Sequence, residues 1–169
     1  ILQPTLRGIQ NENMDYRGII FIGLMITREG PKVLEYNVRF GDPETQVVLP
    51  RLETDIVEIF NAMLEQRLSD IDIQWNDKGV VCVVLASKGY PEDYEKGKEI
   101  SGLDNIGANT IVFHGGTSIE DGKMVTNGGR VLGVTSWAEN IEEARSLAYE
   151  NVDKIHFEGK NYRKDIAVR

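Results

Sequence analysis

Residues 33–46 read Val-Leu-Glu-Tyr-Asn-Val-Arg-Phe-Gly-Asp-Pro-Glu-Thr-Gln. In a β-strand, successive side chains point to opposite faces. The alternation predicts a polar face and an apolar face, made respectively of Val33, Glu35, Asn37 and Arg39 and of Leu34, Tyr36, Val38 and Phe40. The apolar face can pack on a core. The polar face carries a carboxylate, an amide and a guanidinium in a row, successive ones about 6 to 7 Å apart.

The order of these polar groups has two interpretations. Oxygen donors bind hard cations such as Mg²⁺, and a planar guanidinium binds phosphate oxygens, so the row suits a cation beside a phosphate. Strand periodicity alone favours the other interpretation, in which this is a half-buried edge strand with a solvated face. Both stay open at this point.

The strand is expected to end at Gly41-Asp42-Pro43-Glu44. Glycine permits unusual backbone angles, and Pro43 pushes Asp42 towards an extended conformation. Asp42 and Glu44 would then be presented at the end of the strand. An ordinary connecting loop accounts equally well for this composition.

The segments before residue 33 predict a helix and a hairpin. Residues 1–13 have apolar side chains at helical spacing, which indicates the last turns of a helix whose beginning is missing. Residues 16–27 are apolar and rich in β-branched side chains, as in a buried strand. A Gly-Pro turn at 28–31 then joins them to the strand at 32–40 as an antiparallel hairpin.

The segments after residue 44 predict helices and then a boundary. Residues 45–52 are expected to form a short helix that ends near a proline. A capping box and an apolar stripe predict a helix from residue 55 to about Leu68. Residues 69–76 are polar and acidic, and we place the boundary between two units there.

The second half of the chain has a different pattern. The predicted elements are short strands separated by Gly-rich turns, at 79–86, 110–114, 123–126 and 130–136, and one amphipathic helix over 140–155. A β-rich unit backed by one helix is a small α+β module.

Composition excludes several classes of protein. The 169 residues are 41% hydrophobic and carry a net charge of −8, which argues against neutralising a nucleic-acid backbone. No apolar run approaches the ~20 residues that span a bilayer. Cys82 is the one cysteine, so an internal disulfide is excluded and a reducing compartment is expected. It lies in an apolar run, which indicates a buried, inert thiol. His114 and His156 lie in ordinary contexts and are expected to have structural or solvent roles.

Several stretches together resemble one enzyme family. Glu35, Asn37 and Arg39 resemble the Glu-x-Asn-x-Arg metal strand of the ATP-grasp ligases. Residues 39–46 resemble the signature of one group of these enzymes, the phosphoribosylamine–glycine ligases (glycinamide ribonucleotide synthetases). Further stretches that resemble this family, in the same order, are 16–18, 23–25, 88–91, 125–132 and 162–166.

The resemblance implies a fold and an activity. It implies the C-terminal part of an ATP-grasp domain at 1–72, followed at 73–169 by a small, β-rich, barrel-like C-terminal domain (a rudiment hybrid motif). Such an enzyme joins glycine to 5-phosphoribosylamine through a glycyl phosphate, consumes ATP, and serves de novo purine (IMP) biosynthesis in the cytoplasm. The N-terminal part of the enzyme is expected to be missing here, so the chain alone is expected to be inactive.

The resemblance also implies residue roles. Glu35 and Asn37 occupy the family's positions for ligands of Mg²⁺ or Mn²⁺. Arg39 would stabilise the transferring phosphoryl group or the acyl phosphate, and Leu34 would help to enclose the adenine of ATP.

The loop that follows is implied to bind the acceptor. Gly41, Asp42 and Glu44 would bind phosphoribosylamine, with the carboxylates accepting hydrogen bonds from its amine or ribose hydroxyls.

Two alternative functions of the chain remain. One is another ATP-grasp ligase or carboxylase, which the 41–46 continuation disfavours, and the other is a non-catalytic assembly module.

Overall fold

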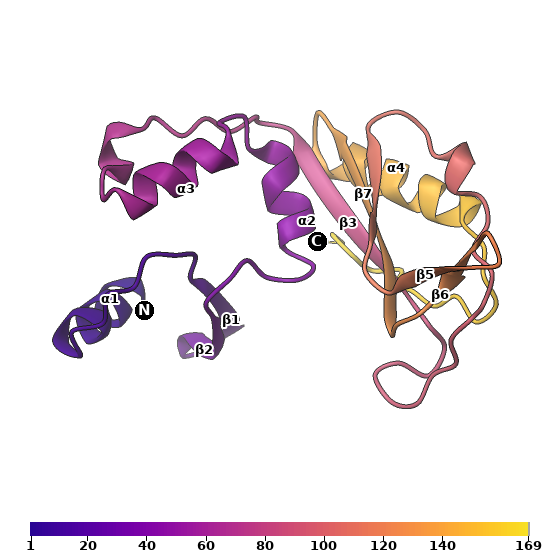
Figure 1. Ribbon diagram of the computed structural model, residues 1–169, viewed down its shortest axis with the longest axis horizontal. Helices are drawn as coiled ribbons and strands as arrows, with labels where there is room; N and C mark the ends of the chain where they lie inside the picture. The colour runs from indigo at the N-terminus through magenta and orange to yellow at the C-terminus, as the bar shows by residue number, and fades with distance from the viewer. Residues whose placement is uncertain (169) are drawn as a thin grey trace. The chain divides into compact units, whose positions relative to one another are not determined.

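The chain divides into two compact units in the computed structural model, which describes residues 1–168 (Figure 1). Unit 1 consists of Ile1–Glu44 and Leu52–Trp75, and unit 2 consists of Thr45–Arg51 and the chain from Asn76 onward. The chain therefore enters unit 2 briefly, returns to unit 1, and then enters unit 2 again. Each unit contains both helices and strands, so the α+β class is confirmed.

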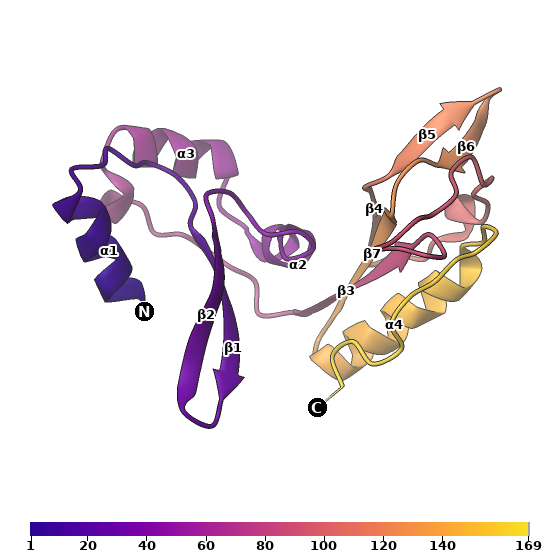
Figure 2. The same ribbon diagram turned by 90° about the horizontal axis from the view of Figure 1, so that it is seen from below.

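Unit 1 is built around a two-stranded hairpin. Its elements are α1 (Leu2–Asn11), β1 (Phe21–Thr27), β2 (Gly30–Asn37), α3 (Ile56–Leu64) and the 3₁₀ turn η2 (Leu68–Asp70). The helix predicted within residues 1–13 and the antiparallel hairpin are both confirmed. Figure 2 shows β1 and β2 side by side.

The two strands of this hairpin are shorter than predicted. β1 begins at Phe21 rather than residue 16, because the Tyr16 hydroxyl donates a hydrogen bond of 2.6 Å to the Ile19 carbonyl and bends this segment locally. β2 ends at Asn37 rather than residue 40. At the turn, Gly30 has φ of 100°, a left-handed conformation that glycine adopts without steric cost.

Helix α3 shows how local chemistry sets element bounds. The Asp55 carboxylate accepts a hydrogen bond of 2.7 Å from the Val57 amide and so caps the first turn. The expected continuation to Leu68 is wrong. The helix ends at Leu64 because Gln66 adopts φ of 58°, which a right-handed helix cannot contain.

Unit 2 contains two open antiparallel sheets. Its elements are α2 (Thr45–Val48), η1 (Leu49–Arg51), β3 (Gly79–Ala86), η3 (Leu103–Asn105), β4 (Thr110–His114), β5 (Thr117–Glu120), β6 (Lys123–Thr126), β7 (Arg130–Ala138) and α4 (Ile141–Lys154). One sheet has the order β3-β7-β4 and the other pairs β5 with β6. All four strands and the helix predicted here are confirmed, with β7 two residues longer. β5 was not predicted, because its short sequence Thr-Ser-Ile-Glu has only one strongly apolar side chain.

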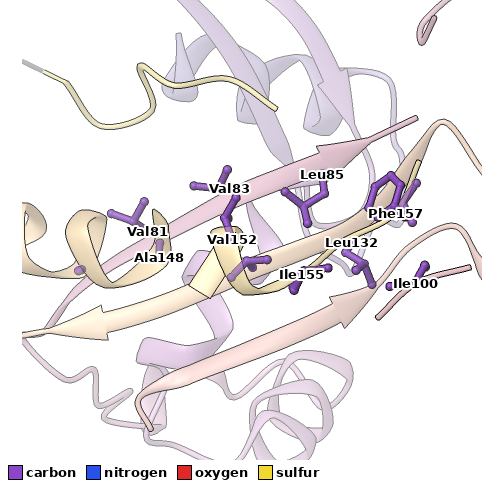
Figure 3. Packing of buried hydrophobic residues seen from close by; sticks show 12 residues of the cluster. Val81, Val83, Leu85, Ile100, Leu132, Ala148, Val152, Ile155 and Phe157 are labelled. Atoms are coloured by element: carbon purple, nitrogen blue, oxygen red, sulfur yellow. The ribbon is translucent and has the colours of Figure 1, made fainter. Parts of the chain in front are cut away.

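The core of unit 2 lies between α4 and the larger sheet. It consists of buried residues from β3, β7 and α4 and from the segments around them: Val81, Val83, Leu85, Ile100, Val131, Leu132, Val134, Ala144, Ala148, Val152, Ile155 and Phe157 (Figure 3). The alanines of α4 let the helix approach the sheet closely. Each fully buried Val, Leu or Ile side chain contributes about 1.5–3 kcal/mol.

The opposite face of this sheet carries Cys82 and Gly133. Cys82 is buried, as its apolar context predicted. A Cβ atom on Gly133 would lie 3.3 Å from Cys82 Sγ and 3.7 Å from Gln46 Cγ, so α2 packs on this face. This contact explains why Thr45–Arg51 belongs to unit 2. Among the described residues, no helix is long and apolar enough to cross a bilayer.

The end of α4 is capped by a side chain. Lys160 Nζ donates hydrogen bonds of 3.0 Å to the Val152 carbonyl and 2.6 Å to the Ile155 carbonyl. The Val152 carbonyl also accepts a hydrogen bond of 3.3 Å from the Ile155 amide, so the ammonium group adds a second donor there and complements the helix dipole. Burial lowers the pKa of Lys160.

A buried amide links α4 to the loop before β4. Asn151 is fully buried, and its Oδ1 accepts a hydrogen bond of 2.9 Å from the Gly107 amide. Its Nδ2 donates to Thr110 Oγ1 at 3.1 Å and to the Leu147 carbonyl at 2.9 Å. Removing one partner of such a buried hydrogen bond leaves the other polar group unsatisfied and destabilises the fold.

We therefore expect Asn151→Leu to lower the free energy of unfolding by about 2 to 4 kcal/mol, because the Gly107 amide would lose its acceptor. The matched control is Glu150→Ala on the exposed side of the same helix, where loss of an ion pair to Lys154 should cost at most ~0.5 kcal/mol. Urea unfolding of the two variants measures both values. Equal destabilisation by the two substitutions would contradict the role given to Asn151.

Candidate functional site

The predicted metal ligands lie at the end of the hairpin in unit 1. Asn37 Nδ2 donates a hydrogen bond of 3.0 Å to Glu35 Oε1. Glu35 is exposed and Asn37 is half-buried. The structure therefore places these two side chains together on one face of β2.

A bulge changes the rest of the predicted polar face. Glu35 is paired with Gly23, whereas Val33 is paired with Leu24, so Leu34 has no directly opposite residue on β1. One extra residue in a strand interrupts the alternation of faces. Val33 therefore does not continue the row of Glu35 and Asn37.

Arg39 lies beyond the last residue of β2, so its direction is set by the following loop and not by strand alternation. Its Nη1 donates a hydrogen bond of 2.6 Å to the Phe40 carbonyl. The side chain is exposed, and a guanidinium has five N–H donors, so further donors remain for a ligand. The expectation that Arg39 continues the strand row is wrong.

The apolar face expected to pack on a core is largely exposed in unit 1. Leu34 is 63% exposed, Tyr36 is 51% exposed and Val38 is 73% exposed. The Tyr36 hydroxyl is hydrogen-bonded to Thr5 Oγ1 of α1 at 2.9 Å. Phe40 is half-buried, but within residues 1–168 this apolar face is not packed on a core over residues 34–38.

The loop after β2 folds back on itself. Gly41 is buried, and a Cβ atom there would overlap Glu44 Oε2 and lie 3.1 Å from Phe21 Cε2. The Glu44 carboxylate thus lies over Gly41, while Asp42 is exposed. The two predicted substrate carboxylates consequently have different surroundings. Phe21, which borders this loop, was not among the predicted site residues, although the glycines at 23 and 41 could have indicated a ring lying against the backbone.

The donor set fits a nucleotide-bound cation rather than a closed metal cage. No group of three or more His, Cys, Asp or Glu side chains in the described part of the chain could hold a metal ion. Glu35 and Asn37 supply two oxygen donors. Mg²⁺ is commonly held by one or two protein oxygens together with waters and substrate phosphates, so two donors are compatible with it.

Two of the motif stretches in unit 2 hold each other in place. Gly89 has φ of 99°, and the tight turn that it allows brings the Tyr90 ring over Gly129. The Ser87 hydroxyl also donates a hydrogen bond of 2.8 Å to the Gly128 carbonyl. A side chain at position 129 would overlap the Tyr90 ring. The stretches 88–91 and 125–132 therefore have a structural explanation.

A cavity of about 510 Å³ lies beside the first of these loops, and three of the charged side chains that line it form ion pairs with one another. Lys98 Nζ lies 2.7 Å from Glu95 Oε2 and 3.2 Å from Glu158 Oε2. Hydrogen bonds to Glu95 and Glu158 raise the pKa of Lys98, and the hydrogen bond from Lys98 lowers the pKa of Glu95. The cavity is lined by unit 2 residues and shares none of the predicted site residues.

Comparisons with known proteins found matches to residues of both units. The family model described as "Phosphoribosylglycinamide synthetase, C domain" matches residues 80–169. The model described as "Phosphoribosylglycinamide synthetase, ATP-grasp (A) domain" matches residues 1–45. The crystal structure of a phosphoribosylamine–glycine ligase from Thermotoga maritima is similar to 96% of this chain, with a TM-score of 0.77 and 45% sequence identity, and the match covers 40% of that chain.

Curated relatives give the same result. The chain is 52% identical over 168 residues to a phosphoribosylamine–glycine ligase of Caldanaerobacter subterraneus subsp. tengcongensis, with 99% of this chain and 40% of the relative covered. It is also 52% identical over 167 residues to a bifunctional purine biosynthetic protein of Schizosaccharomyces pombe, of which it covers 21%. The chain thus spans at most about two fifths of the length of these relatives. With a C-domain match across more than half of its residues and an ATP-grasp match at its start, the chain belongs to the phosphoribosylglycinamide synthetase family.

Proposed function

We propose that this chain is the part of a phosphoribosylamine–glycine ligase that holds the metal and the acceptor substrate. The observation that carries the proposal is the Glu35–Asn37 hydrogen bond, directly before the loop of Gly41, Asp42 and Glu44. The complete enzyme would join glycine to 5-phosphoribosylamine and form glycinamide ribonucleotide, ADP and phosphate in purine biosynthesis. A location in the cytoplasm is part of this proposal.

The reaction needs two transfers. The γ-phosphoryl group of ATP would pass to the glycine carboxylate to form glycyl phosphate. The amine of phosphoribosylamine would then attack the carbonyl carbon and displace phosphate. A divalent cation, Mg²⁺ or Mn²⁺, would neutralise charge on the phosphate oxygens when bound. The protein's contribution to such transfers is mainly positioning and electrostatic stabilisation.

The residues of β2, together with Arg39 after it, would position the cation and the transferring phosphoryl group. Because Asn37 Nδ2 donates to Glu35, its Oδ1 is left as an acceptor beside the Glu35 carboxylate, and both could hold the cation. Arg39 is exposed and could turn from the Phe40 carbonyl to the transferring phosphoryl group. Leu34 is 63% exposed, which makes its apolar side chain available to the adenine ring.

The loop residues would bind the acceptor. Asp42 is exposed and could accept hydrogen bonds from the ribose hydroxyls or the amine of phosphoribosylamine. Glu44 lies against Gly41, whose lack of a side chain lets the carboxylate approach the backbone.

The proposal also assigns parts of the chain to parts of the enzyme. Residues 1–72 would be the C-terminal part of the ATP-grasp domain, and residues 73–169 would be the C-terminal domain, a barrel-like rudiment hybrid motif. Open sheets of three and two strands are compatible with part of a barrel-like module, and its closure stays a prediction. Membership of the family disfavours the other ATP-grasp ligases and carboxylases.

The isolated 169-residue chain is expected to have no ligase activity, since two protein oxygens and an exposed Leu34 do not enclose a nucleotide. The measurement is phosphate release from ATP with glycine and phosphoribosylamine present. The complete protein that contains this chain serves as the positive control. Substrate-dependent phosphate release by the purified 169-residue chain would contradict this expectation.

In that complete protein, Glu35→Ala and Asn37→Ala should each raise the Mg²⁺ concentration needed for half-maximal rate by about tenfold or more, because each removes one oxygen donor. The matched control is Glu29→Ala, which removes an exposed carboxylate of the same hairpin that pairs with Lys32 at 3.0 Å. Its Mg²⁺ dependence should equal that of the wild type. Unchanged Mg²⁺ dependence in both site variants would reject the metal assignment.

A further inference from the structure

We propose that Phe21 is a positioning residue, whose ring sets the distance between the Glu35–Asn37 pair and the loop of Gly41 and Glu44. The inference deepens the proposed function and rests on it. It is based on the position of the Phe21 ring, which lies among the polar side chains of the candidate site.

The ring lies on the polar face of the hairpin. Phe21 is paired with Asn37, and Gly23 is paired with Glu35, so all four share one face of the two strands. A Cβ atom on Gly23 would lie 3.1 Å from Glu35 Cγ and 3.7 Å from Phe21 Cε1. One edge of the ring therefore lies beside the glycine that Glu35 covers.

The other edge of the ring meets the substrate loop. A Cβ atom on Gly41 would lie 3.1 Å from Phe21 Cε2 and 3.0 Å from Glu44 Cδ, and it would overlap Glu44 Oε2. Cε1 and Cε2 are on opposite edges of a phenyl ring. The ring thus fills the space between Gly23 and Gly41, and a carboxylate side chain lies over each of these glycines.

The rigid Phe21 ring thus links the position of the Glu35–Asn37 pair to that of the loop. A phenyl ring is planar and its side chain has only two rotatable bonds, so the positions of its edges are tightly linked. Glycine at 23 and at 41 leaves room for the ring, because any side chain would meet it or a neighbouring carboxylate. Removing the ring would let the loop move relative to Glu35 and Asn37. A displacement of about 1 Å in such a site can cost up to a hundredfold in rate.

The test uses the complete protein that contains this chain, with variants Phe21→Ala, Phe21→Leu and Phe21→Tyr. We expect Phe21→Ala to raise the KM for phosphoribosylamine by about tenfold, while the KM for ATP changes less than about twofold. Phe21→Leu should give an intermediate value, and Phe21→Tyr, which keeps the ring, should restore a KM near that of the wild type.

The matched control is Ile26→Ala, which truncates an apolar side chain of the same strand that is 77% exposed and lies away from the loop. Its kinetic constants should equal those of the wild type. A merely structural role of Phe21 would lower the melting temperature and the amount of active enzyme but would leave the KM for phosphoribosylamine unchanged. That result would overturn the inference.

A second variant keeps the test decisive if Phe21→Ala does not fold. Gly41→Ala keeps the ring and adds a Cβ atom that displaces the Glu44 carboxylate, so it should raise the same KM. An unchanged KM in Gly41→Ala and Phe21→Leu would also overturn the inference. Failure of the wild-type protein to form glycinamide ribonucleotide would instead reject the proposed function, so the two failures are distinguishable.

Discussion

The antiparallel pairing of β1 with β2 is the constraint on which the candidate site depends. Main-chain hydrogen bonds set Gly23 opposite Glu35 and Phe21 opposite Asn37, and these pairs put a ring and two polar side chains on one face. The bulge at Leu34 leaves this part of the register intact and changes only the part nearer the turn. Asn37 and Glu35 can therefore share a hydrogen bond of 3.0 Å at the end of a strand.

Unit 2 shows that a recognisable motif need not be part of a site. Residues 88–91 and 125–132 are among the further stretches that resemble the family, and packing explains the glycines in them. Tyr90 needs a glycine at 129, and Gly89 supplies the positive φ for the turn that places Tyr90 there. A side chain at position 129 would overlap the Tyr90 ring, so sterics alone account for this glycine.

Local patterns predicted most elements of this protein. Alternation and turn residues correctly located β3, β4, β6 and β7. The capping box correctly indicated the start of α4, where the Asn140 side chain accepts a hydrogen bond of 2.9 Å from the Glu143 amide. The element bounds that were predicted wrongly depend on local interactions that apolar periodicity does not reveal. A left-handed Gln66 ends α3 early, and a side-chain hydrogen bond from Tyr16 delays the start of β1.

Residues 35–46 alone indicated the family and named the predicted ligands, and apolar periodicity and turn residues along the rest of the chain predicted most of the element types. The packing of the strands and loops sets which of these side chains meet. It joined Glu35 to Asn37, turned Arg39 to the Phe40 carbonyl, and placed the Phe21 ring between two glycines 18 residues apart in sequence, at 23 and 41. The physical reason is that strand alternation describes one strand, whereas register, bulges and close packing arise between strands.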